Sequence, residues 1–400
     1  LLWIGIILDK LKEKRKISIF GSTGSIGKNT VELIVLNRSS YDVVALTGGR
    51  NIVKLAEQAR LLDVELVVTA FDDLFLQLKE LMAGTNTRVA AGKNAILEAS
   101  DIRADIFVSA IIGFSGLEPS IRSLKHGTTL ALANKESLVV AGTLLMSESA
   151  RFGAKIIPID SEHSGIFQLL SGNSIEDVEK IIITASGGKF RDWTRDEILN
   201  VTLNQASEHP TWTMGKRITI DSNSMFNKAM ELIETKEFFQ VDHKKIEVLI
   251  HPQSVVHALV CFVDGGMLAH LSDHDMKHAI NYALNWPARR NSTVKSLDLT
   301  KVTPLNFENV REDIFPVLKL ARDVMDAGGL RGTVFNAAKE IALDRFISSE
   351  VGFLDMNLIV EKTLSELEKQ NFILDVEQDL GNIVYLDSVA RKVAKNLILK

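Results

Sequence analysis

The chain has 400 residues, 46% of them apolar, and carries 46 basic against 51 acidic side chains. At roughly 100–200 residues per domain, this length predicts more than one domain, each with a sizeable core. The net charge of −5, without a long basic run, argues against nucleic acid as a partner.

Cysteine usage and the first residues bear on the compartment. Cys261 is the only cysteine, so the chain forms no internal disulfide, which fits the reducing cytoplasm. It lies in an apolar run, and we interpret it as a core residue. The apolar segment Leu1–Leu8 is far shorter than the roughly 20 residues that cross a bilayer, so we expect no membrane association. Because the chain begins with Leu, an upstream targeting segment and an organellar location stay open.

Residues 1–159 alternate short β-branched runs with helix-like stretches. This βαβ rhythm predicts an α/β, Rossmann-like domain with a parallel sheet covered by helices on both faces. The expected strands are Ile17–Phe20, Val43–Leu46, Leu66–Thr69, Ile106–Ala110, Thr128–Ala131 and Lys155–Ile159.

The first expected strand runs into a glycine-rich loop, residues 21–27, and a helix from about Lys28. Backbone N–H groups and the helix dipole can bind a pyrophosphate there. The spacing is G-x-x-G-x-x-G rather than G-x-G-x-x-G, so a tight turn explains the loop alone equally well.

The end of the second expected strand bears on the choice between NAD and NADP. An NAD site places a carboxylate there, against the ribose hydroxyls. Here that end carries Gly49, Arg50 and Asn51, whereas Asp42 opens the strand at the opposite edge of the sheet. Arg50 offers an ion-pair partner to a 2′-phosphate, which favours NADP. A solvated residue at a helix start is the alternative.

From residue 160 the pattern becomes α+β, and we expect a central catalytic and dimerisation domain over residues 160–290, a polar linker over 291–312 and a small α-helical domain over 313–400. Asp387 is a plausible N-cap of the last helix. The other expected elements are strands Lys180–Thr184 and Glu247–Ile250, a hairpin of Val255–Val263 with Met267–Leu271, and helices Phe335–Phe346 and Leu358–Leu367.

Two acidic residues, Asp160 and Glu162, follow the last strand of the first domain. In an extended chain, residues two apart face the same way. Two carboxylates without an intervening histidine suit Mg²⁺ or Mn²⁺. A solvated acidic pair is the alternative.

A second polar group is expected on one face of a helix. Helical spacing places Asn227 four residues and Lys228 three residues before Glu231. This face can hold a metal and a polar substrate together, although a surface ion pair explains Lys228 and Glu231 equally well.

The turn Ser186-Gly187-Gly188 follows a strand and can cradle a phosphate through backbone and hydroxyl groups; an ordinary turn is the alternative. The irregular stretch 204–217 carries His209 and Trp212 and is typical of a lid. An anchoring role for Trp212 is the other interpretation.

A zinc site is the competing metal hypothesis. His270, His274 and His278 recur every four residues and would share a face of a helix. His270, however, belongs to the hairpin pattern, which argues against zinc.

In combination and order, eight segments closely resemble the 1-deoxy-D-xylulose 5-phosphate reductoisomerase family over nearly the whole chain. They are "GSTGSIG" at 21–27, "GRN" at 49–51, "ALANKESLVVAG" at 131–142, "PIDSEHSGIFQ" at 158–168, "ASGGKFR" at 185–191, "HPTWTMGKRITIDS" at 209–222, "NKAMELIE" at 227–234 and "HPQSVVHALV" at 251–260.

The resemblance implies conversion of 1-deoxy-D-xylulose 5-phosphate to 2-C-methyl-D-erythritol 4-phosphate in isoprenoid precursor biosynthesis. The family rearranges its phosphosugar by retro-aldol cleavage and re-addition and then reduces the aldehyde with NADPH. It also implies a divalent ion, Mg²⁺ or Mn²⁺ with Co²⁺ as a further option, and a homodimer.

The resemblance also assigns residues of the active site. Asp160, Glu162 and Glu231 would ligate the metal, and Ser161 would bind the chelating substrate oxygens. Lys135 would lie near the substrate, with His251 as a weaker assignment. The phosphate and hydroxyl contacts would come from Ser186, His209, Ser222, Asn227 and Lys228, with Trp212 covering the substrate.

The cofactor contacts implied by the resemblance lie in four segments. Met214 and Gly215 would flank the nicotinamide. The remaining contacts would be Thr23, Gly24, Ser25 and Ile26 at the pyrophosphate, Gly49, Arg50 and Asn51 at the 2′-phosphate, and Asn134 with Glu136 at the nicotinamide.

The chain departs from the family pattern at Asn223 and Ser224, where Ala and Thr are common, and at Lys339, where Asn is usual. Two other functions stay open. Another NADP-dependent dehydrogenase would need no metal, and a nucleotide-sensing protein would bind NADPH without turnover.

Overall fold

The computed structural model describes residues 14–212, 214–302, 304–369, 375–376 and 378–398. Leu1–Leu8 lies outside these residues. The chain divides into two compact units, one of residues 1–134, 147–160 and 276–294, the other of residues 135–146, 161–275 and 295–400. The domain limits expected from the sequence stay a prediction. Within the described residues, no helix has the length and apolar character required to cross a membrane.

The first unit contains a parallel sheet, as the βαβ rhythm predicts, and every strand expected there is present. One edge strand, β4 (Arg88–Ala91), is missing from the sequence prediction. The strand order is β4-β3-β2-β1-β5-β6-β7. The other strands are β1 (Arg15–Phe20), β2 (Tyr41–Gly48), β3 (Leu66–Thr69), β5 (Ile106–Ser109), β6 (Thr129–Leu132) and β7 (Lys155–Pro158).

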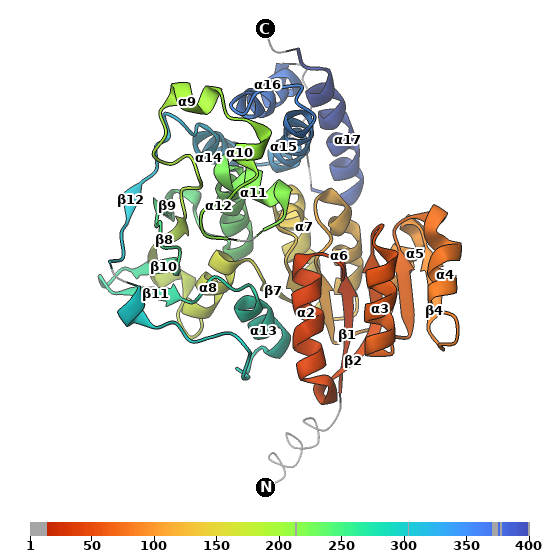
Figure 1. Ribbon diagram of the computed structural model, residues 1–400. Helices are drawn as coiled ribbons and strands as arrows, with labels where there is room; N and C mark the ends of the chain where they lie inside the picture. Colours follow the sequence, from red (N-terminus) through yellow and green to blue (C-terminus); the bar gives the residue numbers. More distant parts are fainter. Residues whose placement is uncertain (1–13, 213, 303, 370–374, 377, 399–400) are drawn as a thin grey trace. The chain divides into compact units, whose positions relative to one another are not determined.

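The strand order creates a switch point at the centre of this sheet. The chain runs outward from β1 to β4 and then returns to β5 on the other side of β1. Dinucleotides bind at the carboxyl ends of strands at such a point. The helices of this unit (Figure 1) are α2 (Ser25–Leu36), α3 (Ile52–Leu62), α4 (Phe75–Leu81), α5 (Lys93–Ser100), α6 (Leu117–Leu124) and α13 (Lys277–Asn285).

The second unit contains a mixed sheet of order β11-β10-β8-β9-β12. The predicted hairpin turns at Asp264-Gly265-Gly266, where Gly265 has a φ of +86°. The last strand, β12 (Glu308–Asn309), comes from the segment expected to be an irregular linker. The others are β8 (Val178–Ala185), β9 (Ile246–Ile250), β10 (Val256–Phe262) and β11 (Met267–Leu271).

Two helices of the second unit carry most of the polar residues of interest. α8 (Ser161–Leu169) packs on β10 and β11, and a Cβ at Gly165 would lie 3.1 Å from the Cβ of His270. α12 (Phe226–Phe239) is largely buried. Shorter helices are α9 (Arg195–Leu199), α10 (Leu203–Ala206) and α11 (Lys216–Asn223), and α7 (Lys135–Phe152), kinked at Ala141, begins in this unit.

The C-terminal part is helical, as predicted, with α15 (Arg331–Ile347) packed against both α16 (Asp355–Lys369) and α17 (Leu380–Asn396). α14 (Val317–Ala327) packs on α12. The N-cap assigned to Asp387 is wrong. Asp379 caps α17 by accepting a hydrogen bond from the amide of Asn382 at 2.9 Å, whereas Asp387 lies inside the helix.

Candidate active site

Three carboxylates form a candidate group of metal ligands. One oxygen each of Asp160, Glu162 and Glu231 lies within 4.8 Å of the others. Asp160 follows β7, Glu162 lies in the first turn of α8, and Glu231 lies in α12. The expectation that an extended chain aligns Asp160 with Glu162 is wrong, because α8 begins at Ser161. The residues nevertheless converge, and they form a hard, all-oxygen site.

Two ammonium groups offset part of the negative charge of this cluster. The Lys228 Nζ lies 2.5 Å from Glu162 Oε1 and donates to Glu231 Oε2 as well. The Lys135 Nζ donates to Glu231 Oε1 at 3.0 Å and to Asn227 Oδ1 at 2.9 Å. The predicted face of α12 therefore exists, and it is buried rather than a surface ion pair, since Lys228 is 4% and Glu231 0% exposed.

The charges in this cluster shift their own titration. Burial favours the neutral form of Glu162, but the Lys228 ammonium and His257 outweigh it and lower the pKa of Glu162 to about 2. For Lys228, burial acts against the charge, but the carboxylates of Glu162 and Glu231 raise its pKa. Near neutral pH, Glu162 is therefore ionised and Lys228 charged. Ser161 donates a hydrogen bond to Glu162.

The turn after β8 meets His209. The Nε2 of His209 lies 3.2 Å from Ser186 Oγ and 3.1 Å from Ser222 Oγ. Gly187 and Gly188 adopt φ values of +83° and +67°, which glycine tolerates without strain. The predicted phosphate cradle thus has two hydroxyl groups, one imidazole and a tight glycine turn.

The protonation of His209 follows from its contacts. Its Nδ1 accepts hydrogen bonds from the backbone amides of Trp212 at 3.0 Å and Thr211 at 3.2 Å. Nδ1 therefore carries a lone pair and Nε2 the proton. Burial and the neighbouring His274 lower the pKa of His209 to about 4, so the ring is neutral near pH 7 and donates toward the cradle.

One buried side chain ties the cradle together. Asn223 is 0% exposed and donates to the carbonyls of Ala206 at 3.0 Å and Glu208 at 2.8 Å. Its Oδ1 accepts from the amide of Lys189 at 2.8 Å. Asn223, a departure from the family pattern, therefore joins the stretch before His209 to the glycine turn.

Aromatic and histidine rings gather around Trp212. The Trp212 ring lies 5.3 Å from that of His274 and 6.3 Å from that of His257. The three histidines of the zinc hypothesis do not share a helix, because His270 lies in β11, His274 in the following loop and His278 in α13. Among the described residues, the groups of side chains able to hold a metal contain none of the three.

In the first unit, the glycine loop has the geometry expected of a phosphate loop. Gly21 has a φ of +87°, and a Cβ there would lie 2.4 Å from the carbonyl oxygen of Ala110. A Cβ on Gly27 would lie 2.3 Å from the carbonyl oxygen of Gly21. Gly24 precedes α2 and supplies no side-chain cap. The first backbone amides of α2, at Ser25 and Ile26, therefore lie at the positive end of the helix dipole, and Thr23 lies in the loop just before them.

The end of β2 carries a surface cation. Arg50 lies 3.2 Å from Asp73, with both side chains more than 60% exposed, and its guanidinium lies 4.0 Å from the centre of the Phe71 ring. Asn51 caps α3 through the amide of Lys54, next to Gly49. Such an exposed ion pair costs little to exchange for a phosphate.

The remaining cofactor candidates have different surroundings. Asn134, in the first unit, is buried and donates to the carbonyls of Ile111 at 2.6 Å and Gly113 at 2.9 Å. Burial raises the pKa of Glu136, in the second unit, and the Lys339 charge partly offsets this. Gly215 is the N-cap residue of α11. His251 is buried, with its Nδ1 2.8 Å from the carbonyl oxygen of Asn306.

Comparison with known proteins identifies the family. The family model described as 1-deoxy-D-xylulose 5-phosphate reductoisomerase matches residues 17–142, and those of its C-terminal domains match residues 156–239 and 271–393. A relative of that name from Jannaschia sp. is 53% identical over 382 residues, 96% of this chain and 97% of its own length. The chain belongs to the 1-deoxy-D-xylulose 5-phosphate reductoisomerase family. Another relative, from Cereibacter sphaeroides, is 54% identical over 383 residues, 95% of this chain and 97% of its own.

Solved structures of 1-deoxy-D-xylulose 5-phosphate reductoisomerases share this fold. The enzyme from Zymomonas mobilis in complex with NADPH superposes with a TM-score of 0.90 at 40% identity, covering 96% of this chain and 98% of its own. A reductoisomerase in complex with NADPH, fosmidomycin and magnesium gives 0.88 at 36% identity, covering 95% and 97%. The resemblance inferred from the sequence motifs is therefore confirmed.

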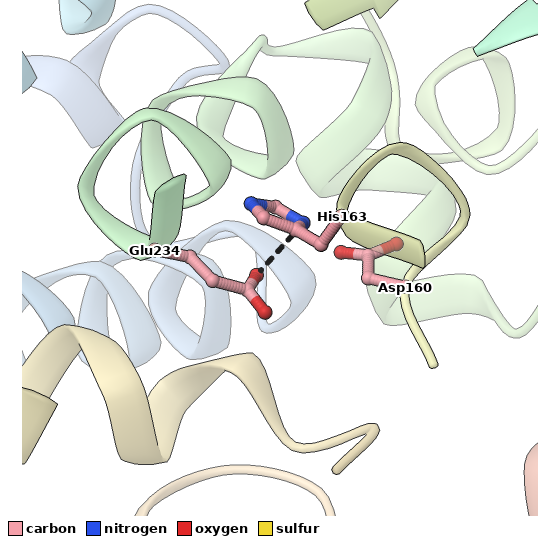
Figure 2. A group of neighbouring side chains, drawn as sticks. All are labelled: Asp160, His163 and Glu234. Carbon is pink, nitrogen blue, oxygen red and sulfur yellow. Dashed lines mark ion pairs between the residues drawn. The ribbon is translucent and has the colours of Figure 1, made fainter. Parts of the chain in front are cut away.

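Sequence reasoning missed a buried pair of side chains in this reductoisomerase family member. His163 from α8 and Glu234 from α12 lie together, and with Asp160 they form a second group of candidate metal ligands (Figure 2). His163 is one residue after Glu162, and Glu234 is three residues after Glu231. That spacing was the available signal, but it does not reveal that the two segments meet.

Proposed function

We infer that this protein converts 1-deoxy-D-xylulose 5-phosphate to 2-C-methyl-D-erythritol 4-phosphate, with NADPH and a divalent metal ion, in isoprenoid precursor biosynthesis. The observation that carries this conclusion is the meeting of Asp160, Glu162 and Glu231 within 4.8 Å in a chain of this family. The Zymomonas mobilis relative binds NADPH, and a further relative binds NADPH, fosmidomycin and magnesium.

The donor set of this chain fits a divalent ion. Three carboxylate oxygens match the ligands that Mg²⁺ and Mn²⁺ prefer. The pKa of Glu162 is lowered to about 2. Its carboxylate is therefore already ionised at neutral pH and needs no deprotonation to become a metal ligand. When bound, the ion supplies Lewis-acid polarisation of the substrate ketone and hydroxyl groups, and NADPH supplies the hydride.

The side chains around the carboxylates position the substrate. Ser161 binds the chelating substrate oxygens beside Glu162. Lys228 and Asn227 bind substrate hydroxyl groups. Lys135 Nζ, held 3.0 Å from Glu231, places a positive charge where negative charge develops on the substrate, which lowers the barrier.

The phosphate of the substrate binds at the cradle of Ser186, His209 and Ser222. A neutral His209 donates through Nε2 without adding a charge, and the two hydroxyl groups complete the contact. Binding energy from this nonreacting phosphate holds the reacting carbons in place. Trp212 closes over the substrate and excludes water, and Met214 flanks the nicotinamide.

The glycine loop binds the pyrophosphate of NADPH through the start of α2, and Arg50 binds the 2′-phosphate. Asn134, Glu136 and Gly215 contact the nicotinamide end. We further propose that the protein is a homodimer and acts in the cytoplasm, as the family resemblance and the lone cysteine suggest.

The test is an absorbance assay of NADPH oxidation with 1-deoxy-D-xylulose 5-phosphate, first with Mg²⁺ or Mn²⁺ and then after chelation. We expect oxidation only with metal, and methylerythritol phosphate as the product. Oxidation that survives chelation would favour a metal-independent dehydrogenase. NADPH binding without turnover would favour a nucleotide-sensing protein.

A further inference from the structure

A buried histidine and glutamate join α8 to α12, the two helices that carry Glu162 and Glu231. The Nδ1 of His163 lies 3.4 Å from the Oε2 of Glu234, with side chains 0% and 1% exposed. Asp160, three residues before His163, contributes a carboxylate oxygen within 4.8 Å of both groups. Figure 2 shows the imidazole of α8 directed toward the glutamate of α12.

The other ring nitrogen of His163 reaches the backbone that carries Glu231. Its Nε2 lies 3.0 Å from Thr235 Oγ1 and 3.2 Å from the carbonyl oxygen of Glu231. The Thr235 hydroxyl already donates its proton to that carbonyl, at 2.7 Å. Nε2 must therefore donate, and the ring bridges α8 to the Glu231 turn of α12.

The contact between the two side chains is an ion-pair distance in the protein interior, with both side chains at most 1% exposed. Replacing either partner by an apolar residue leaves the other buried without it, which is costly.

We propose that His163 and Glu234 are positioning residues that set the spacing of the metal ligands Glu162 and Glu231. The bridge fixes the turn of α12 that carries Glu231 against the first turn of α8, which carries Glu162. Outer groups that orient ligands in this way typically change metal affinity 10–100-fold when removed. This inference rests on the metal-dependent function proposed above.

A second metal ion held by Asp160, His163 and Glu234 is the competing interpretation. The burial of His163 and Glu234 argues against it, because Mg²⁺ usually keeps several of its waters. The number of Mn²⁺ ions bound per chain separates the two interpretations.

The test is a Mn²⁺ titration of the full chain, followed by electron paramagnetic resonance, on the wild type, Glu234→Ala and Glu234→Gln. We expect one Mn²⁺ per chain and affinity about tenfold weaker in Glu234→Ala. Glu234→Gln should stay within about threefold of the wild type, since its amide can donate to Nδ1. NADPH affinity should be unchanged in both. Equal affinities in Glu234→Ala and the wild type, equal loss in both variants, or two bound ions would overturn the proposal.

Thr235→Val and Thr235→Ser decide the matter if Glu234→Ala does not fold. Val keeps the shape but removes the nearer of the two acceptors of Nε2, so only Val should weaken Mn²⁺ binding. Equal affinities in these two variants would overturn the proposal. Glu231→Gln keeps the outcomes distinguishable. If the wild type binds no Mn²⁺, or if Glu231→Gln binds it as the wild type does, the metal-dependent function proposed above is wrong. That result differs from each of the results that would overturn the positioning role.

Discussion

The glycine loop and the carboxylate cluster are built by different means. The loop consists of seven consecutive residues that offer backbone groups to a ligand. Added Cβ atoms at Gly21 or Gly27 would collide with backbone atoms. The cluster is made of side chains from separate segments: Asp160 follows β7, Glu162 lies in α8 and Glu231 lies in α12, about 70 residues further along the chain. A site formed by the backbone can be predicted from one short segment of the sequence. A site formed by side chains depends on how separate segments pack against one another.

The largest effect should follow from removing one charge of the cluster. Glu231→Gln should lower turnover about 1000-fold, since losing metal-assisted stabilisation of about 4 kcal/mol has that effect on a rate. NADPH affinity should persist, because the loop lies in the other unit. Steady-state kinetics and an NADPH titration measure both. Glu247→Gln, an exposed glutamate of β9, is the control, and near-normal turnover in Glu231→Gln would remove the metal mechanism.

The converse experiment changes only the loop. Gly27→Ala should weaken NADPH binding about 100-fold and destabilise the fold by about 2 kcal/mol, because its Cβ would lie 2.3 Å from the Gly21 carbonyl oxygen. Mn²⁺ affinity should be retained. Gly24→Ala is the control for stability, since its Cβ meets only a 3.4 Å contact. Thermal unfolding and two titrations check this, and equal stability of the two variants would contradict it.

A third variant separates phosphate binding from chemistry. Asn223→Ala removes three hydrogen bonds that hold the cradle, so the KM for the phosphosugar should rise about tenfold while kcat changes less. Asn200→Ala removes an exposed side chain that donates to the Asp196 carbonyl, and it should leave both parameters unchanged. A KM equal to that of the wild type would show that the cradle holds its shape without Asn223.

Arg50→Ala tests the end of the cofactor assigned to the 2′-phosphate. A charge-assisted contact contributes about 1.5–3 kcal/mol, so the preference for NADPH over NADH should fall about tenfold. Lys54→Ala, another exposed cation nearby in α3, should preserve the preference. Initial rates with both cofactors provide the measurement. An unchanged preference would return Arg50 to a solvated residue at a helix start.

The smallest expected effect concerns the pH dependence of stability. The pKa of His209 is lowered to about 4 in the folded protein, whereas an unfolded histidine titrates near 6.5. The unfolded state therefore binds more protons between these values, and stability should fall as the pH drops from 6.5 toward 4. Urea unfolding over this range should show a shallower fall for His209→Gln. If the stability of the wild type and that of His209→Gln fell in parallel with pH, the pKa of His209 would not be lowered in the folded protein.

Much of the first unit is predictable from the sequence because its strands are continuous buried runs. β4 escapes prediction because it is an edge strand of four residues, Arg88–Ala91, with no fully buried position. The sequence prediction placed the start of α17 too late. Gly381, a residue type that is unfavourable inside helices, lies in the first turn directly after the cap at Asp379. Asp387 instead accepts hydrogen bonds from Arg391, one turn later in the same helix.

The candidate site was predictable in its residue types but not in its contacts. Asp160 and Glu162 were correctly grouped, although for a wrong reason, since a helix rather than a strand brings them together. The bridge from His163 to Glu234 spans helices whose meeting no local pattern encodes. The same holds for Asn223, whose three backbone partners lie on two separate segments.

The most direct test of the central claim is a paired titration of the wild type and Glu231→Gln with Mn²⁺ and with NADPH. The two sites are built separately, so Glu231→Gln should bind NADPH as the wild type does and lose Mn²⁺ binding. Unchanged Mn²⁺ affinity in Glu231→Gln would contradict the carboxylate site. Loss of both ligands in a folded variant would contradict the separation of the two sites.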